Sequence, residues 1–366
     1  MDKLEIKLRM LTPLWTGGAD GQSDRARETG IIGSLRWWYE AVVRGLGGRA
    51  CDPTEGGCIY KREQGESHAQ AYERLCDACK LFGCTGWQRR FRLSVQVDGF
   101  PFDSHFCLAT LDKAGSFNHW WLAKIFEESI GARLPFGNVN MHVQFLPDST
   151  GYQAAFQGLL SLMSLYGGIG AKTQYGFGRF DWAERLSAES AIRAIRNQLD
   201  SQHLSAAPHS PGYYTLRHFW HLHCLVSDED PLIQKFKGAT VVGDSRTFRY
   251  WQDTYLPVSF DIRYKLPGST SLGLRQSYRM EKGKMAARAI FGTLKGEKRG
   301  SRVFVSHLYK EKPSEPNYSL DVWGFTETDL MDKIQGYLRK MFTKMDIDQT
   351  VTGPQLLEDA TTVPQT

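Results

Sequence analysis

The residues best suited to chemistry lie in one segment, from Gly167 to Arg179. Its five glycines let backbone N–H groups approach a phosphate without interference from a Cβ atom. Cations and aromatic rings alternate between them, so the segment predicts a contact with single-stranded nucleic acid. The alternative is a hairpin-like turn whose glycines only satisfy backbone angles. The candidate contacts are Gly167, Gly168, Gly170, Lys172, Thr173, Gln174, Tyr175, Gly176, Gly178 and Arg179.

This segment differs from the common nucleotide-binding loops. It lacks the Gly-Lys-Ser/Thr sequence of a Walker loop. It also follows an expected helix, whereas a Rossmann turn opens one. We therefore expect no nucleotide cofactor.

A cluster of cysteines predicts a metal site. Cys76-x-x-Cys79 is a common half-site for tetrahedral zinc, and Cys51 with Cys58 forms a looser second half. An odd total of seven cysteines in a chain that we expect to be cytosolic argues against a disulfide framework. We predict a structural zinc that stabilises this region, with Cys84 able to replace any ligand. Reduced, buried cysteines are the alternative.

Further cations could face a phosphate backbone. Segment 263–302 holds eleven Lys or Arg residues against Glu281 and Glu297, whereas residues 1–210 carry 23 basic and 22 acidic side chains. Such an excess predicts a phosphate-facing surface, and a solvated helix face is the alternative. The candidates here are Arg275, Arg279, Lys284, Arg299 and Arg302. In the first half they are Trp15, Arg25 and Arg27 in a loop, and Arg89 and Arg90 beside Phe91, where an ordinary loop and a soluble strand edge are the alternatives.

Histidines are the side chains on which metal-independent RNA cleavage would depend. His221 and His223 share one face of a predicted strand, but no carboxylate or lysine partner is apparent in the sequence. We predict no catalytic residue and no enzyme. A metal-independent endoribonuclease is the alternative.

The hydrophobic periodicity predicts the elements that position these residues. It indicates a strand at 3–11, a helix from Ser34 to about Arg44 with Ser34 as its cap, strands at 91–97 and 139–146, a helix at 153–166 and a strand at 178–183. This order is the split βαβ pattern of an α+β, ferredoxin-like fold.

The chain divides into two such domains. We predict a first domain at 1–199 with an insertion at about 46–80, a linker at 200–212, a second domain at 213–345 and a disordered tail at 346–366. The second domain should open with a strand at 213–226, and its last helix should begin near Thr326.

A weak internal repeat supports this division. Leu81-Phe82-Gly83 matches Ile290-Phe291-Gly292 at an offset of 209, and Ser34-Leu35-Arg36 matches Gly273-Leu274-Arg275 at an offset of 239. The difference of 30 residues localises an insertion in the first half, which is where the cysteines lie.

Bulk properties exclude other classes. No stretch approaches the roughly 18 apolar residues of a membrane span, and the amino-terminal residues alternate instead of forming a signal peptide. We expect a cytoplasmic location and no membrane partner.

Four motifs together resemble a known family. GGIGAKTQYGFGRF at 167–180, TPLWTGGADG at 12–21, GSLRWWYE at 33–40 and LCDACKLFGCTGW at 75–87 are similar to the RAMP superfamily, and within it to subunit one of the type III-B CRISPR Cmr effector complex. The second half matches mainly through IFG at 290–292 and GSRVFVSHLYK at 300–310.

The resemblance implies two tandem ferredoxin-like (RRM-like) domains and a role in RNA-guided antiviral defence. It implies an RNA-binding subunit of a ribonucleoprotein, near the 3′ end of the guide, with guide CRISPR RNA, target RNA and other RAMP subunits as partners. Target cutting would belong to neighbouring subunits. The resemblance adds the start of the helix around Arg36 to the RNA-contact candidates. A purely architectural subunit that touches only protein remains a further alternative.

Overall fold

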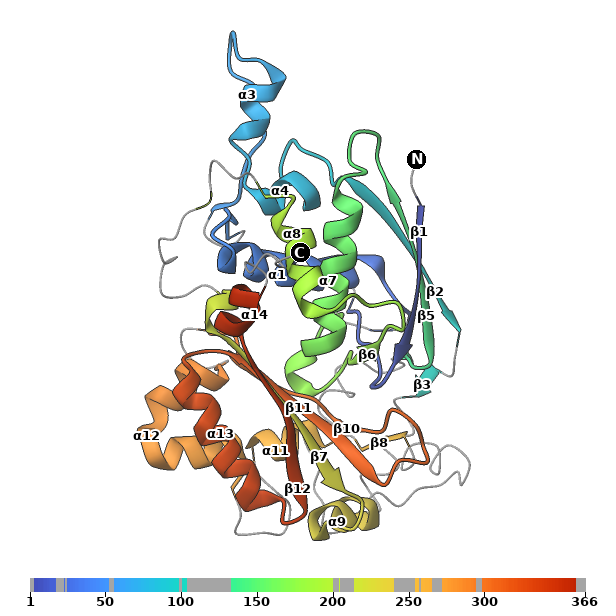
Figure 1. Cartoon of the computed structure of the whole chain (residues 1–366), viewed down its shortest axis with the longest axis vertical. Helices are drawn as coiled ribbons and strands as arrows, with labels where there is room; N and C mark the ends of the chain where they lie inside the picture. The colour runs from blue at the N-terminus through green and yellow to red at the C-terminus, as the bar shows by residue number, and fades with distance from the viewer. Residues whose placement is uncertain are drawn as a thin grey trace, which may run out of the picture.

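The computed structural model describes residues 3–17, 23, 25–52, 56–98, 101–103, 133–199, 204, 214–239, 254–256, 258–264, 272–293 and 298–359. Figure 1 shows the two halves of the chain one above the other, each with a sheet and packed helices. All strand pairings in the two main sheets are antiparallel. The mixed α+β class is therefore confirmed. The expected linker, apart from Leu204, lies outside the described residues.

The sheet of the first half has the order β2-β5-β1-β6. Its strands are β1 (Lys3–Met10), β2 (Phe91–Asp98), β5 (Asn138–Phe145) and β6 (Phe180–Asp181). Ile6, Leu8 and Met10 are buried while Lys3 and Lys7 are exposed, because side chains on a strand alternate between the two faces of the sheet. The last strand is shorter than the predicted 178–183.

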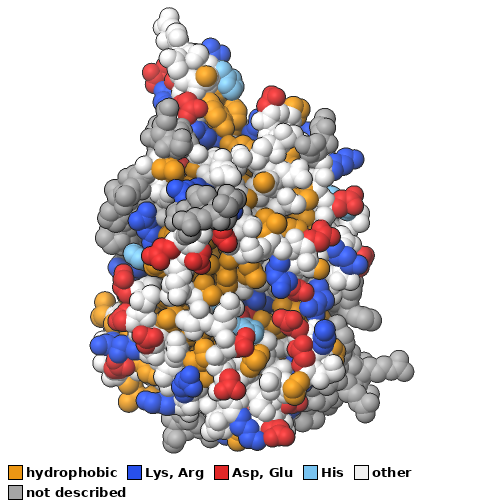
Figure 2. All heavy atoms as spheres, viewed as in Figure 1, with side chains coloured by type: hydrophobic (Ala, Val, Ile, Leu, Met, Phe, Trp, Pro, Cys, Tyr) orange, Lys and Arg blue, Asp and Glu red, His pale blue; other side chains and the backbone are white. Residues whose placement is uncertain are grey.

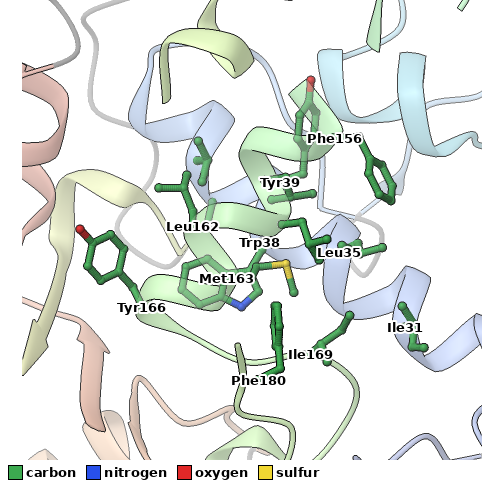
Figure 3. Packing of buried hydrophobic residues seen from close by; sticks show 14 of the residues in the cluster. Ile31, Leu35, Trp38, Tyr39, Phe156, Leu162, Met163, Tyr166, Ile169 and Phe180 are labelled. Carbon is green, nitrogen blue, oxygen red and sulfur yellow. The ribbon is translucent and has the colours of Figure 1, made fainter. Parts of the chain in front are cut away.

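Three helices pack in the first half: α1 (Glu28–Gly45), α7 (Tyr152–Tyr166) and α8 (Ala188–Arg196). Figure 3 shows Leu35 and Trp38 of α1 near Met163 of α7 in the buried core. The prediction that Ser34 caps the first helix is wrong. Ile31 is also buried, which extends the apolar stripe towards the N-terminus, so the helix begins at Glu28.

A projecting finger interrupts the first half between α1 and β2 (Figure 1). It contains α3 (His68–Glu73) and leads into α4 (Asp77–Phe82). The helix α3 starts with a capping box between Ser67 and Gln70. A separate pair of short strands, β3 (Pro101–Asp103) and β4 (Arg133–Pro135), lies between β2 and β5 in the chain.

The second half is built on a sheet of order β12-β7-β11-β10-β8, with β9 also paired to β11. Its strands are β7 (Phe219–Ser227), β8 (Tyr255–Leu256), β9 (Val303–Val305), β10 (Leu308–Tyr309), β11 (Asn317–Phe325) and β12 (Met345–Thr352). Its helices are α9 (Pro231–Ala239), α11 (Ser259–Tyr264), α12 (Leu274–Phe291), α13 (Thr328–Met341) and α14 (Gly353–Asp359).

The prediction of a disordered tail at 346–366 is wrong for residues 346–359. They form most of β12 and all of α14, and β12 pairs with β7 from Met345↔Val226 to Thr352↔Trp220. The many polar side chains that suggested disorder belong to an edge strand, where charged residues are common. Residues 360–366 lie outside the described residues.

Of the two apolar clusters formed by the described residues, one spans both halves and the other belongs to the second half alone. Buried side chains of the second half, among them Phe219, Phe325 and Trp323, join the apolar cluster of the first half. Trp37 of α1 packs edge-on against Phe325, with ring centres 5.3 Å apart. The halves therefore meet through a continuous apolar and aromatic contact.

Candidate functional site

The glycine-rich segment begins where α7 ends and bonds to its own protein. The N–H of Gly170 donates to Ser34 Oγ at 2.9 Å, and that of Ala171 donates to the Trp15 carbonyl at 2.7 Å. Other bonded N–H groups are those of Gly167, Ile169, Tyr175, Gly176, Gly178 and Arg179. Amides that are already bonded cannot hold a phosphate, so the prediction of a backbone cradle is wrong at these positions.

Close packing explains the glycines better than a ligand does. A Cβ atom at Gly178 would lie 2.0 Å from the Ile169 carbonyl oxygen, and one at Gly176 would lie 2.6 Å from the His307 N–H. Both glycines have positive φ angles, of 81° and 91°. The remaining glycines of the segment, Gly167, Gly168 and Gly170, are buried as well.

Arg179 is a structural residue at the junction of the halves. It is 5% exposed, and its Nε lies 2.8 Å from Asp321 Oδ2 of β11. Its Nη1 donates to the carbonyls of Ser164 and Gly167. A buried guanidinium with these partners offers nothing to RNA, so the prediction that Arg179 is an RNA contact is wrong.

Asp321 gathers polar groups from both halves. Besides Arg179, it accepts a hydrogen bond of 2.6 Å from the Tyr309 hydroxyl and lies 3.1 Å from His221 Nε2 and 2.9 Å from His223 Nδ1. It is therefore the carboxylate partner that the sequence did not reveal. Asp321 lies directly opposite His223 in the β7–β11 pairing, but the two are far apart in the chain.

The pKa values in this network follow from burial and pairing. Burial alone would raise the pKa of Asp321, but Arg179 and the two histidines outweigh it and hold that pKa well below its usual value. Burial lowers the pKa of His221. Burial would also lower the pKa of His223, but the hydrogen bond to Asp321 and the negative charge of that carboxylate together raise it. His221 is 1% exposed, so it is surrounded by protein rather than by a surface that substrate reaches.

The accessible part of the segment is the turn at 171–175, whose residues are all half-buried. Lys172 has a positive φ of 57°, and its ammonium group lies 3.6 Å from the centre of the Trp15 ring. Trp15 itself is 1% exposed. The prediction that Trp15 contacts RNA is wrong, because its ring instead supports Lys172.

Arg36 is half-buried, and its guanidinium is directed at the cysteines. Its Nε donates to Glu40 Oε1, its Nη1 to the Gly83 carbonyl and its Nη2 to Cys79 Sγ at 3.3 Å. Burial would lower the pKa of Arg36, but the bonds to Glu40 and Cys79 raise it. We therefore correct the assignment of Arg36 as an RNA contact.

The four cysteines predicted as metal ligands come together. The sulfur atoms of Cys51, Cys58, Cys76 and Cys79 all lie within 4.8 Å of one another. The Sγ atom of Cys51 is 3.5 Å from that of Cys79 and 3.6 Å from that of Cys76. Zinc bonded tetrahedrally at about 2.3 Å would hold sulfurs about 3.8 Å apart, so the donor set fits a metal.

The surroundings of the cluster also suit thiolates. The N–H groups of Cys51 and Cys79 donate to Cys76 Sγ, and the N–H of Cys76 donates to Cys58 Sγ, each at 3.4 Å. Hydrogen bonds from Cys76 and Cys79 lower the pKa of Cys51, and the bond to Cys51 contributes to raising the pKa of Cys76 to about 12. The cluster thus favours a thiolate at Cys51 and a protonated Cys76, and coordination to a cation would stabilise thiolates at the other positions.

The other first-half cations differ in exposure. Arg25 is exposed and Arg27 half-buried. Arg89 donates to the Phe91 carbonyl, and the Arg90 guanidinium lies 5.1 Å from the Trp87 ring. Phe91 is 1% exposed, so Trp87 is the half-buried ring beside these cations. The sequence analysis missed Trp87, although it stands in the GCTGW stretch that it quoted.

The second-half cations surround α12 and the hairpin that follows it. Arg279, Lys284 and Arg299 are exposed, while Arg275 and Arg302 are half-buried. Arg275 donates to the Gly292 carbonyl at 3.4 Å. Figure 2 shows cationic and acidic side chains interspersed on one face of the molecule. Positions 265–271 and 294–297 of the basic segment lie outside the described residues.

Two second-half residues at the turn were not singled out by the sequence analysis. Arg263 donates to the Gln174 carbonyl at 2.8 Å, and the backbone N–H of His307 points to the Gly176 carbonyl at 3.5 Å. Each is far from the turn in the chain. Arg263 stands in no quoted motif, and His307 stands in the GSRVFVSHLYK stretch at 300–310, which does not indicate its neighbour, so only the folded chain reveals the contact. None of the helices among the described residues has the length and apolar character needed to cross a membrane.

Comparisons with known proteins agree with the motifs. The model of the RAMP superfamily matches residues 7–181. Cmr1 from Pyrococcus furiosus has a similar structure, with a TM-score of 0.48, 12% identity and coverage of 96% of this chain and 99% of that one. No match was found among curated proteins.

Two assemblies contain chains of similar structure. One is a type III-B Cmr-β complex bound to cognate target RNA, with a TM-score of 0.40, 15% identity and coverage of 92% of this chain and 98% of that one. The other is a type IV-B CRISPR complex, with a TM-score of 0.32, 12% identity and coverage of 50% and 92%.

Proposed function

Because the chain belongs to the RAMP superfamily, we propose that it is an RNA-binding subunit of a type III-B CRISPR ribonucleoprotein in antiviral defence. It contacts guide CRISPR RNA and target RNA near the 3′ end of the guide, in the cytoplasm, beside other RAMP subunits. It is not the nuclease, and it needs no nucleotide cofactor. The observation that carries this proposal is the family match, which contains the whole glycine-rich segment.

The strand orders support a finer description of the fold. In the first half the order β2-β5-β1-β6 places the strands as in a split βαβ unit, and β12-β7-β11 with β10 or β9 repeats that arrangement in the second half. We propose that the halves are tandem ferredoxin-like domains, the first carrying the cysteine finger as an insertion.

The RNA surface that we propose is smaller than the sequence suggested. With Trp15, Arg36, Arg179 and the five buried glycines removed, the remaining candidates are the turn at 171–175 and exposed or half-buried cations. These cations are Arg25, Arg27, Arg89, Arg90, Arg275, Arg279, Lys284, Arg299 and Arg302.

We propose that the four-cysteine cluster holds a structural zinc. The ion would supply folding energy to a finger that has few buried side chains of its own. Cys51, Cys58, Cys76 and Cys79 would hold the ion, and Arg36 would offset part of the negative charge of the thiolates.

The RNA-binding role is tested by salt-dependent affinity. Labelled single-stranded RNA should bind the purified chain, and Lys172→Ala or Arg299→Ala should each weaken binding about threefold to tenfold and reduce the slope of log affinity against log salt by roughly one. Lys235→Ala on the exposed face of α9 is the matched control and should change neither. Unchanged binding in both variants would sink this assignment.

The endoribonuclease alternative needs a separate test. Incubating the chain with labelled RNA and EDTA should leave the RNA intact. Cleavage that persists in EDTA and disappears in His221→Ala would favour the enzyme instead. The architectural alternative would be favoured if the assembled complex gave no crosslinks between RNA and residues 171–175.

A further inference from the structure

Arg263 on α11 lies at the meeting point of three segments. It is 1% exposed. Its Nη1 donates to the Gln174 carbonyl at 2.8 Å, and its Nη2 donates to the Phe291 carbonyl at 2.7 Å and to Ser301 Oγ at 2.6 Å. A planar guanidinium with donors in a fixed fork can hold three such acceptors in one geometry, which an ammonium group cannot.

These three acceptors belong to the separate pieces of the proposed RNA surface. Gln174 lies in the turn of the first half, Phe291 is the last residue of the cationic helix α12, and Ser301 lies between Arg299 and Arg302. Arg263 therefore connects the turn directly to both cationic segments of the second half.

Other second-half residues also contact the turn. The ring of Phe260, also on α11, lies 5.8 Å from that of Tyr175. At Gly176 a Cβ atom would lie 2.6 Å from both His307 Nδ1 and Ser259 Cβ. The end of the turn, from Gln174 to Gly176, is thus held against the second half, although the chain that forms it belongs to the first.

Among the residues that the structure describes, none forms an ion pair with Arg263. Among the described residues its hydrogen-bond partners are two carbonyls and a hydroxyl, and its buried Nε has no hydrogen-bond partner. A buried cation without a carboxylate is costly, which argues for a role beyond stability. Its field also favours an anion over the neighbouring surface.

We propose that Arg263 is the positioning residue that joins the turn at 171–175 and the cations at 298–302 into one RNA-binding surface built from both halves. This inference rests on the proposed RNA-binding function. It gives the two halves a single composite site, whose ligand is the phosphate backbone of single-stranded RNA.

The first test measures position without RNA. In Arg263→Ala, amide hydrogen exchange at residues 171–176 should rise at least tenfold, while exchange in α7 stays unchanged. The matched control is Arg44→Ala. Arg44 is also buried, and it donates to the carbonyls of Ala50, Cys51 and Tyr214, away from the turn. Unchanged exchange at 171–176 in Arg263→Ala would overturn the positioning role, whether or not the chain binds RNA.

The second test measures affinity for labelled single-stranded RNA. Arg263→Ala should weaken binding about tenfold, Arg263→Lys should weaken it less, and Arg44→Ala should lower the melting temperature without changing affinity. If Arg263 acts through the turn, its effect should shrink when Lys172→Ala is already present.

The outcomes of these tests separate the two proposals. A wild-type chain that binds no RNA would refute the proposed function and leave the exchange result standing. Wild-type affinity in Arg263→Ala, or an equal loss in Arg44→Ala that follows the loss of stability, would refute the composite surface. If Arg263→Ala weakened RNA binding as much in the Lys172→Ala variant as in the wild-type chain, the idea that Arg263 acts through the turn would be refuted.

Discussion

The turns that follow α4 in the first half and α12 in the second have the same backbone. Gly83 has φ and ψ of 83° and 164°, and Gly292 has 77° and 168°. The carbonyl of each accepts a hydrogen bond from an arginine at the matched position, Arg36 in the first half and Arg275 in the second. This shared arrangement supports the internal repeat that the sequence suggested.

What differs is the chain between arginine and glycine. In the first half it is the finger with its four cysteines, and Arg36 also donates to Cys79 and Glu40. In the second half it is one helix broken at Gly283, with Met280 and Met285 exposed on either side. The comparison shows that the arginine and the glycine turn are common to both halves. The segment between them has a different structure in each half.

The largest expected effect is loss of the metal site from the first half. Cys76→Ser should remove a ligand and destabilise the finger by on the order of 5 kcal/mol, because structural zinc contributes directly to folding. Thermal unfolding and metal content would measure this. Cys84→Ser, outside the four-sulfur cluster, should retain one metal per chain. Equal losses in both variants would contradict a four-ligand site and the contrast between the halves.

Lowering the pH should reduce the free energy of unfolding through His307, which contacts the turn of the first half from the second. Burial lowers the pKa of His307 from its usual 6.5 to about 3. Between these values the unfolded chain binds a proton that the folded chain does not, so stability falls as pH decreases, by about 1.4 kcal/mol per pH unit.

His307→Asn should reduce this pH slope, because an amide takes up no proton and can still accept from the Ser259 N–H, as His307 Nδ1 does. Denaturant unfolding at pH 7, 6 and 5 would measure the slope. His142→Asn, at an exposed position, is the control and should leave it unchanged. An undiminished slope in His307→Asn would place the acid-sensitive group elsewhere.

Removing the matched arginines should give a smaller difference in unfolding free energy between the two halves. Arg36→Ala should cost about 3 kcal/mol of unfolding free energy, because it leaves the buried Glu40 with only the longer contact to Arg44 and removes the cation beside the thiols of the finger. Arg275→Ala, which loses one long bond to Gly292, should cost about 1 kcal/mol. Denaturant titration would compare the two, and equal losses would show that the insertion has not changed the role of the arginine.

Alanine substitutions at the matched glycines should give the smallest difference in unfolding free energy between the two halves. Alanine at Gly83 would place a Cβ 2.7 Å from the Arg89 N–H, and alanine at Gly292 would place one 2.8 Å from the Arg299 carbonyl oxygen. Each change should cost about 2 kcal/mol in thermal or denaturant unfolding. Gly283→Ala has open space around it and should cost about 1 kcal/mol for its positive φ alone. A large difference in unfolding free energy between Gly83→Ala and Gly292→Ala would argue against a turn structure shared by the two halves.

The sequence predicted local features well. The alternation in β1, the apolar stripe of α7, the CxxC half-site and the matched glycines all follow from rules that act over a few residues. The wrong predictions concern residues whose role depends on contacts with distant parts of the chain. Ser34 is a typical cap residue, but inside α1 its hydroxyl binds Gly170, and the polar residues of β12 resemble a disordered tail until β7 pairs with them.

The amino-acid sequence by itself pointed to the family, the α+β class, the four cysteines that come together and the position of the glycine-rich segment. Only the tertiary structure decided what that segment does. It showed that the glycines allow close packing, that Arg179 pairs with Asp321, and that Arg263 supports the turn from the other half. The physical reason is that the ion pair of Arg179 with Asp321 and the hydrogen bond of Arg263 to Gln174 join residues more than 80 positions apart, and no local pattern records which cation stays at the surface.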